Sequence, residues 1–261
     1  MNLDLSNKTA VICGSTQGLG YASAVELALM GCDCVLIARN EESLKNAVAS
    51  LDKTNGQKHQ YLVADFADSN AVKQAIDSLV QNNTVHILVN NTGGPPGGAI
   101  LNAKTDEFIS AFNNHLINNH NLTQAIVPGM KAVGFGRIIN IISTSVKIPL
   151  AGLGVSNTIR GAVASWAKTL ATELAPFGIT VNNVLPGFTQ TARIDYVVSN
   201  KAKKENVSED LVLQKMIAEI PAGRIGKPEE FGAAVAFLCS PAAAYINGIN
   251  LPVDGGRLGC L

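Results

Sequence analysis

Short apolar runs alternate with longer amphipathic stretches along the chain, and this alternation limits the folds that the sequence can adopt. The short runs are rich in Val and Ile and are mostly continuous, which is typical of strands buried on both faces of a parallel sheet. We expect strands at residues 10–13, 34–38, 61–64, 87–90, 137–142, 180–185 and 250–253. We expect helices at residues 19–30, 41–51, 71–81, 106–133, 159–175 and 229–238. The sequence therefore predicts an α/β fold with a doubly wound, mostly parallel seven-stranded sheet and helices on both faces.

The 261 residues carry no internal repeat and no low-complexity linker, so we expect a single domain that spans residues 1–261. The region at about 190–223 breaks the alternation, because it is long, has no strand signal and is strongly charged in its middle. It follows the sixth predicted strand, and open α/β sheets bind ligands beyond the carboxyl ends of their strands. We interpret the region as a lid-like insert; the alternative is a solvated helical excursion that touches no ligand.

Charge and composition favour a globular protein with a small-molecule ligand. Twenty basic residues balance twenty acidic ones, so neither a nucleic acid nor an anionic membrane is indicated as a partner. The N-terminus shows no secretory signal, and no apolar stretch reaches the roughly 18 residues that span a bilayer. The five cysteines lack the spacing of zinc ligands, so we predict no metal and expect mainly small buried residues. The expected location is the cytoplasm.

A glycine-rich segment joins the first predicted strand to the first predicted helix. It reads Gly14-Ser15-Thr16-Gln17-Gly18-Leu19-Gly20. Glycines let the backbone turn tightly and approach a pyrophosphate, while the start of the helix offers unpaired N–H donors and the positive end of a dipole. This placement indicates a Rossmann-type dinucleotide site, although any tight strand-to-helix turn could use such glycines.

The end of the second predicted strand discriminates between the two nicotinamide coenzymes. NAD-binding domains usually place an acidic residue there, to hold the ribose 2′-hydroxyl. This chain has no acid at that point and has Arg39 instead, whose planar set of donors suits a 2′-phosphate. NADP(H) is therefore favoured over NAD(H); the alternative is that Arg39 only solvates the next helix.

Several further motifs resemble those of the short-chain dehydrogenase/reductase family and occur in the same order. Asp65 follows the third predicted strand, Asn90-Asn91-Thr92-Gly93 follows the fourth, and Pro186-Gly187 follows the sixth. Residues 223–230 and 253–256 closely resemble the endings of 3-oxoacyl-(acyl carrier protein) reductase-like members. The resemblance covers nearly the whole chain.

This resemblance implies roles for the motif residues. Asp65 is expected to contact the adenine, and Asn91 and Gly93 to lie beside the cofactor in a segment that stabilises the central sheet. Thr92 replaces an Ala of the family, which we take as a small change. Pro186 and Gly187, with Thr189 or Thr191, are expected to touch the nicotinamide carboxamide.

The catalytic part of the resemblance is largely rebuilt. Family members use a Ser, a Tyr, a Lys and an Asn, and the chain matches the family without gaps from residue 137 to residue 185. Ser143 occupies the Ser place, Ser156 the Tyr place and Arg160 the Lys place. Counting back from Arg137 puts His115 in the Asn place. Only one of the four residues is retained.

Each replacement has a chemical consequence. Ser156 keeps a hydroxyl, but it is shorter than a phenol and a far weaker acid. Arg160 keeps a positive charge and can bind ribose hydroxyls, yet it does not release a proton. His115 introduces an imidazole that ordinarily titrates near 6.5, so we hypothesise a relay through His115, a water, Ser156 and Ser143. The alternative is that His115 packs against a helix and that Ser156 and Arg160 keep their helix soluble.

Three functions remain open on the sequence alone. The first is an NADP(H)-dependent oxidoreductase that acts on a carbonyl or a secondary alcohol, possibly 3-oxoacyl-like. The second is an NADP(H)-binding protein with little or no redox turnover, and the third is a lyase or isomerase with His115 as base. The resemblance also implies a homotetramer or homodimer, to which the apolar residues 242–261 would contribute.

Overall fold

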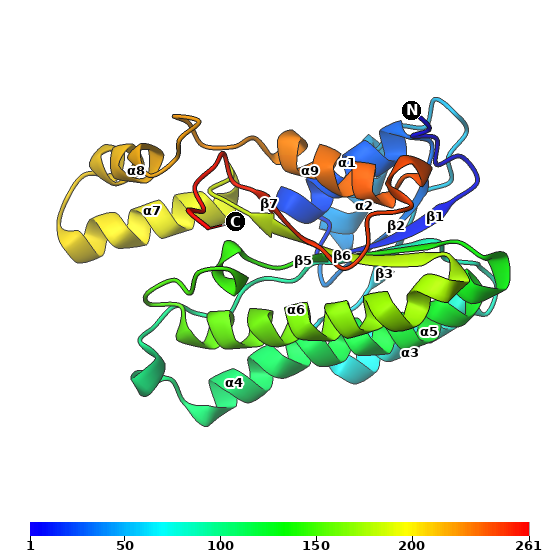
Figure 1. Ribbon diagram of the computed structural model, residues 1–261, viewed down its shortest axis with the longest axis horizontal. Coiled ribbons are helices and arrows are strands. Elements are labelled where there is room, and N and C mark those ends of the chain that lie inside the picture. Colours follow the sequence, from blue (N-terminus) through cyan, green and yellow to red (C-terminus); the bar gives the residue numbers. More distant parts are fainter. Residues whose placement is uncertain (261) are drawn as a thin grey trace.

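The protein is built around one seven-stranded sheet (Figure 1). The structure is a computed structural model and describes residues 1–260. The strand order of the sheet is β3-β2-β1-β4-β5-β6-β7, and every neighbouring pair is parallel. The strands are β1 Thr9–Cys13, β2 Asp33–Ala38, β3 Gln60–Val63, β4 Ile87–Asn90, β5 Gly136–Ile141, β6 Ile179–Pro186 and β7 Asn250–Val253. The predicted parallel sheet is confirmed, with strand ends shifted by at most one residue. Leu261, the last residue of the predicted domain and of the expected oligomer segment, lies outside the described residues.

Helices cover both faces of the sheet (Figure 1). They are α1 Gly18–Leu29, α2 Glu41–Ser50, α3 Ser69–Val80, α4 Thr105–Phe112, α5 Asn118–Val133, α6 Gly154–Leu174, α7 Ala192–Glu205, α8 Glu209–Ala218 and α9 Pro228–Cys239. The Asn40 side chain accepts a hydrogen bond from the first turn of α2, and the Asp68 side chain does the same for α3. Among residues 1–260, no helix combines the length and apolar character that crossing a bilayer requires.

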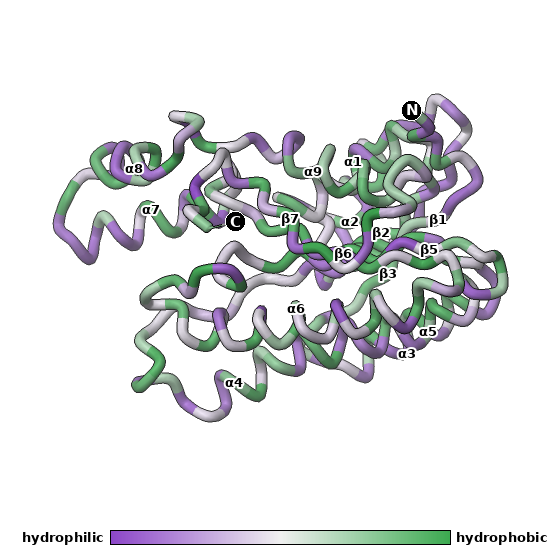
Figure 2. Tube along the Cα trace, in the orientation of Figure 1, coloured by the Kyte–Doolittle hydropathy of each residue, from purple (hydrophilic) through white to green (hydrophobic). Residues whose placement is uncertain are grey.

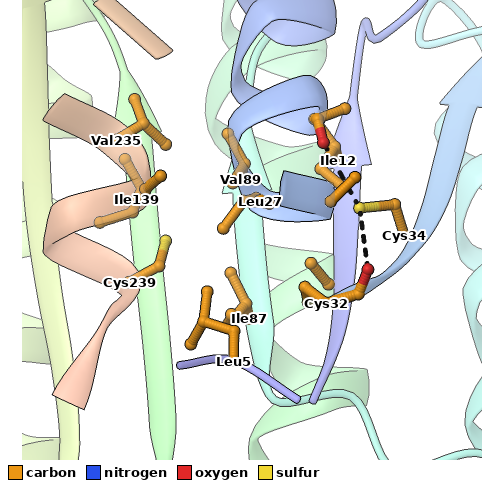
Figure 3. Packing of buried hydrophobic residues seen from close by; sticks show 14 of the residues in the cluster. Leu5, Ile12, Leu27, Cys32, Cys34, Ile87, Val89, Ile139, Val235 and Cys239 are labelled. Carbon is orange, nitrogen blue, oxygen red and sulfur yellow. Dashed lines mark hydrogen bonds between the residues drawn. The ribbon is translucent and has the colours of Figure 1, made fainter. Parts of the chain in front are cut away.

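Two apolar cores lie on opposite faces of the sheet, as the alternation of side chains along a buried strand dictates. Ile12 of β1 packs with α1, α2 and α9, and its neighbour Val11 packs with α3, α5 and α6. Cys32, Cys34 and Cys239 lie inside the first core (Figure 3). Cys13 lies in the second core, where burial raises the pKa of its thiol to about 12. These four cysteines are buried as expected, whereas Cys260 is exposed.

The helix expected over residues 106–133 is interrupted. A π-helical turn, Asn113–Ile117, separates α4 from α5. Such turns widen a helix by one residue and are frequent at functional sites. His115 lies within this turn.

The segment expected to be a lid-like insert forms a helical hairpin. Helices α7 and α8 pack against each other through a small core of their own, made by Val198, Ala202, Val212 and Met216. The turn that joins them is hydrophilic (Figure 2). The charged residues 200–205 therefore form the last turns of α7 rather than an irregular loop.

Four asparagine side chains cross the sheet as a hydrogen-bonded row. The Nδ2 atom of Asn90 on β4 donates to Oδ1 of Asn140 on β5 at 2.9 Å. Asn140 donates to Asn183 on β6 at 2.9 Å, and Asn183 donates to Asn250 on β7 at 2.8 Å. The strands pair these residues directly, so the row follows from the register.

Candidate functional site

The glycines of the first strand-to-helix turn let α1 start directly against the end of β1. Gly14 has a φ of +56°, in the left-handed region that favours glycine. A Cβ atom at Gly20 would lie 2.3 Å from the carbonyl oxygen of Gly14, closer than any carbon can approach. The spacing of the motif therefore has a steric cause.

The start of α1 has the character of an anion site. Within the described chain, Gln17 makes no side-chain cap and the first turn of α1 holds no acidic residue. The first N–H groups of the helix therefore remain available as donors, at the positive end of its dipole. The buried hydroxyl of Ser15 has no hydrogen-bond partner among residues 1–260. A phosphate-bearing ligand would satisfy these donors, so the residues present fit a dinucleotide.

Asn91 joins the loop after β4 to this turn. Its Nδ2 atom donates to the carbonyl oxygens of Cys13 at 3.3 Å and of Gly14 at 3.1 Å. Asn91 therefore holds the ends of two central strands together, as expected of a segment that stabilises the sheet. For Gly93, a Cβ atom would meet nothing within 4 Å in the described chain, so sterics do not explain this glycine. Contacts of Asn91 and Gly93 with a cofactor remain predictions.

The ends of β2 and β3 place Arg39 and Asp65 on neighbouring strands. Arg39 directly follows β2, is exposed, and has no hydrogen-bond or ion-pair partner within residues 1–260. Asp65 is exposed, and its Oδ1 atom accepts a hydrogen bond from the backbone N–H of Ala67. Both side chains lie at the carboxyl edge of the sheet, where ligands of this fold class bind.

Ser143 and Ser156 lie on either side of the loop between β5 and α6. Ser143 follows β5, and its Oγ atom accepts a hydrogen bond of 3.0 Å from the backbone N–H of Ser145. Ser156 lies in the first turn of α6 and is half-buried. Ser143 can still donate its hydroxyl hydrogen to another oxygen, because only its acceptor side is engaged.

Arg160 is buried beneath this loop, with 8% of its surface exposed. Its Nη1 atom donates to the carbonyl oxygen of Ile141 at 2.9 Å, and Nη2 donates to that of Thr92 at 3.4 Å. The alternative that Arg160 keeps its helix soluble is therefore wrong. The guanidinium instead joins α6 to the ends of β4 and β5, and burial lowers its pKa to about 10.

His115 lies in the π-helical turn and is 2% exposed. Its Nδ1 atom forms a hydrogen bond with Oγ1 of Thr92. Burial, and then the nearby charge of Arg160, lower the pKa of His115 to about 3. The expectation of an imidazole that titrates near neutral pH is therefore wrong, and the ring is neutral in cells. A neutral imidazole can still pass on a hydrogen bond, but it does not serve as a strong base.

Thr92 connects these residues and was undervalued in the sequence. Its carbonyl oxygen accepts from Arg160, while its hydroxyl pairs with His115. The Thr in Asn-Asn-Thr-Gly, taken above as a small change, is the one signal that could have revealed this contact. Through Thr92, which is half-buried, the buried side chains of Arg160 and His115 join in one hydrogen-bonded network.

The segment after β6 brings the helical hairpin to the glycine turn. A Cβ atom at Gly187 would lie 2.5 Å from the Cα atom of Asp254, so this glycine permits a close crossing of two loops. Thr189 is buried, and its hydroxyl donates weakly to the carbonyl oxygen of Gly187 at 3.5 Å. A Cβ atom at Gly18 would meet Cγ2 of Thr191 at 3.6 Å, so the residue before α7 lies against the turn. Pro186 ends β6 at the same edge.

Comparison with known proteins places the whole chain in one group. A family profile described as enoyl-(acyl carrier protein) reductase matches residues 14–257. The NADPH-dependent reductase BacG of Bacillus subtilis is 30% identical over 258 residues, which cover 97% of this chain and 99% of that protein. The 3-oxoacyl-[acyl-carrier-protein] reductase FabG of Pseudomonas aeruginosa is 30% identical over 255 residues, with coverages of 97% and 98%.

A solved structure agrees with these sequence relatives. The L-sorbose reductase of Gluconobacter frateurii, complexed with NADPH and L-sorbose, superimposes with a TM-score of 0.93. It is 32% identical, and the alignment covers 100% of both chains. The likeness therefore extends over the sheet, the helices on both faces and the helical hairpin.

Proposed function

The chain belongs to the short-chain dehydrogenase/reductase family, and from that membership we propose that it is an NADP(H)-dependent oxidoreductase acting on a carbonyl or a secondary alcohol. The observation that carries the proposal is the uncapped start of α1, on a turn whose glycines let the helix begin directly against the end of β1. A 3-oxoacyl-like substrate is the finer form of the proposal, suggested by the reductases among the relatives.

The residues at the sheet edge divide the binding of NADP(H) between them. The segment 14–20 would hold the pyrophosphate through backbone N–H groups, and Arg39 would pair with the 2′-phosphate. The remainder of the dinucleotide site would be lined by Asp65, Asn91, Gly93, Pro186, Gly187 and Thr189. When bound, the nicotinamide supplies or accepts the hydride.

The protein's own groups must then manage the charge and proton on the substrate oxygen. Negative charge grows on that oxygen during reduction, so a donor aimed at it stabilises the transition state. Ser143 has a free hydroxyl hydrogen for this task, and Ser156 offers a second hydroxyl from α6. His115 would orient a water beside them as a neutral hydrogen-bonding group, while Arg160 keeps the ends of β4 and β5 in place.

A second candidate is an NADP(H)-binding protein with little turnover. The observation that favours it concerns the four aligned positions: we expect no phenol or lysine there, and burial lowers the pKa of His115 to about 3. A His115-based lyase or isomerase is disfavoured for the same reason.

Calorimetric titration with NADPH and NADH tests the cofactor part of the proposal. We expect saturable binding of NADPH and weaker binding of NADH; no heat with either coenzyme would refute the assignment. NADPH fluorescence followed across a panel of ketones then separates the two candidates, because only an oxidoreductase consumes the bound coenzyme.

A triple variant, His115→Asn, Ser156→Tyr and Arg160→Lys, restores the usual family set and refines the choice. Activity gained by the variant over an inactive parent would support the binding protein. An active parent whose turnover is abolished by His115→Ala would support a working relay. Size-exclusion chromatography with light scattering would check the proposed homotetramer or homodimer.

A further inference from the structure

Arg160 is a buried cation without an acidic partner. The residue is 8% exposed, and no Asp or Glu within residues 1–260 forms an ion pair with its guanidinium. Its two acceptors are the backbone carbonyls of Ile141 and Thr92. Buried charges are normally paired with an opposite charge, because the cost of removing them from water is large. An unpaired guanidinium at this depth can therefore hold an anion, provided that the protein does not use all of its N–H groups.

The chain contains a matched comparison in Arg137, the other buried arginine. Arg137 is 3% exposed and donates to three backbone carbonyls, those of Gly136, Gly178 and Ser240. Its guanidinium also lies 4.3 Å from the centre of the Phe135 ring, which stabilises the cation. Arg137 is the second residue of β5, at the edge of the sheet away from the candidate site. The carbonyls and the ring together account for the Arg137 guanidinium. Arg160 has fewer such partners, and it lies at the carboxyl edge of the sheet, where ligands of this fold class bind.

Arg160 has donors to spare for a ligand. A guanidinium carries five N–H groups, and the two hydrogen bonds to backbone leave about three of them unused. The nearest ionisable neighbour, His115, is held neutral and does not compete for an anion. A forked pair of N–H groups matches the two oxygens of a carboxylate.

Two anions could reach this edge of the sheet, namely the phosphates of the coenzyme and a carboxylate of the substrate. The start of α1 and Arg39 already provide for phosphate, and they belong to β1 and β2. The guanidinium of Arg160 lies on the other side, where it donates to backbone oxygens at the ends of β4 and β5, and Ser143 is two residues beyond the β5 acceptor. We propose that Arg160 binds a carboxylate of the substrate, so that the protein acts on oxo acids or hydroxy acids. This inference rests on the proposed function, because it presumes a bound dinucleotide beside the substrate.

Calorimetry on the protein saturated with NADP⁺ tests the inference without any turnover, since the oxidised coenzyme carries no hydride to transfer. The probes are acetoacetate and 2-oxobutanoate, each compared with its methyl ester, which lacks the charge. We expect the acids to bind at least about 10-fold more tightly than the esters. Arg160→Gln should weaken acid binding by about 10- to 100-fold, which is more than its effect on the binding of NADP⁺ or of the esters.

Variants on the same helix supply the controls. Lys168→Gln removes an exposed positive charge from α6, two turns further along, and should leave acid binding unchanged. Arg160→Lys keeps the charge but loses the fork, so it should bind the acids with intermediate affinity. If circular dichroism shows that Arg160→Gln does not fold, Arg160→Lys and the comparison of acid with ester in the parent decide the question.

Three results would overturn parts of this scheme in different ways. Equal binding of acid and ester by the parent refutes the carboxylate site alone. An equal loss of NADP⁺ and acid binding in Arg160→Gln assigns the guanidinium to the ribose or phosphate of the coenzyme instead. No binding of NADP⁺ by the parent refutes the proposed function, and this inference with it.

Discussion

The two halves of the ligand edge were built under different constraints. At the β1–α1 turn, the chain keeps glycines wherever a Cβ atom would collide with backbone, and Asn91 fastens the turn to β4. At the β5–α6 end, we expect three of the four catalytic positions to hold other side chains, and hydrogen bonds through Thr92 connect two of these, Arg160 and His115. Steric requirements dictate the first end and leave little freedom; the second end depends on chemistry, for which we expect this chain to use other groups.

The difference teaches where a family resemblance can be carried over to a single chain. A steric requirement is visible in the sequence, because only glycine satisfies it. A catalytic requirement belongs to a set of side chains acting together, so replacing several at once changes the chemistry without changing the scaffold. The four predictions below test this contrast.

The largest loss of stability and of coenzyme binding is expected from a substitution in the β1–α1 turn. In Gly20→Ala the new Cβ atom would lie 2.3 Å from the Gly14 carbonyl oxygen, so helix and turn must separate. We expect loss of NADPH binding and a decrease of at least about 2–3 kcal/mol in the free energy of unfolding, measured by urea titration. In the control Gly129→Ala, the Cβ atom meets only Cγ2 of Thr84 at 3.7 Å, so stability should hold. Normal NADPH binding by Gly20→Ala would show that α1 does not hold the phosphates.

A change of charge at the end of β2 should alter coenzyme choice rather than stability. Arg39→Asp removes the proposed partner of the 2′-phosphate and creates an acceptor for a ribose hydroxyl. We expect the ratio of NADPH to NADH affinity to fall by about 100-fold, as measured by calorimetry. Lys53→Ala removes an exposed charge before β3, at the opposite edge, and should leave the ratio unchanged. An unchanged ratio in Arg39→Asp would assign Arg39 to solvation only.

Lowering the pH should decrease the free energy of unfolding, because His115 at the β5–α6 end resists protonation in the folded protein. Its pKa of about 3 in the folded protein lies below the 6.5 of an unfolded chain. Between these values the unfolded chain binds a proton that the folded chain does not, so stability is intact above about pH 6.5 and falls as the pH falls. From pH 7.5 to pH 5 this amounts to about 2 kcal/mol in the free energy of unfolding. His115→Gln should flatten this loss in urea titrations, whereas His120→Gln on α5 controls for the removal of a histidine.

The smallest expected effect tests the centre of the network. Thr92→Val keeps the carbonyl that Arg160 binds but removes the hydroxyl that pairs with His115. We expect a loss of about 1–2 kcal/mol in the free energy of unfolding, with NADPH affinity unchanged. Thr92→Ser keeps the hydroxyl and should retain most of the stability. A loss of NADPH affinity in Thr92→Val would show that the two ends are energetically coupled.

The sequence predicted the fold and the first turn because both depend on local patterns. Continuous apolar runs mark strands buried on two faces, and three glycines mark a close crossing of strand and helix. The resemblance assigned Ser143, Ser156 and Arg160 to catalytic positions, and that assignment remains a prediction. These positions required no knowledge of distant parts of the chain.

The buried network could not be predicted, because its bonds join residues far apart in the sequence. Arg160 binds backbone oxygens of Ile141 and Thr92, and a carbonyl oxygen leaves no signal in a side-chain pattern. The π-helical turn around His115 adds one residue to a helical pattern, a change that periodicity does not resolve. The lowered pKa of His115 then follows from burial that only packing determines.

The row of asparagines across β4, β5, β6 and β7 has a consequence for how accurately the ligand edge is assembled. Sliding any of these strands by one residue would turn its carboxamide to the opposite, apolar face and leave a buried amide without a partner. The row therefore selects one register of the strands, because only that register forms all of the hydrogen bonds between the asparagines. The candidate site residues come a few positions after these asparagines: Asn91 after Asn90, Ser143 after Asn140 and Gly187 after Asn183. The register that the row selects therefore also sets how far along the strand direction each site residue lies.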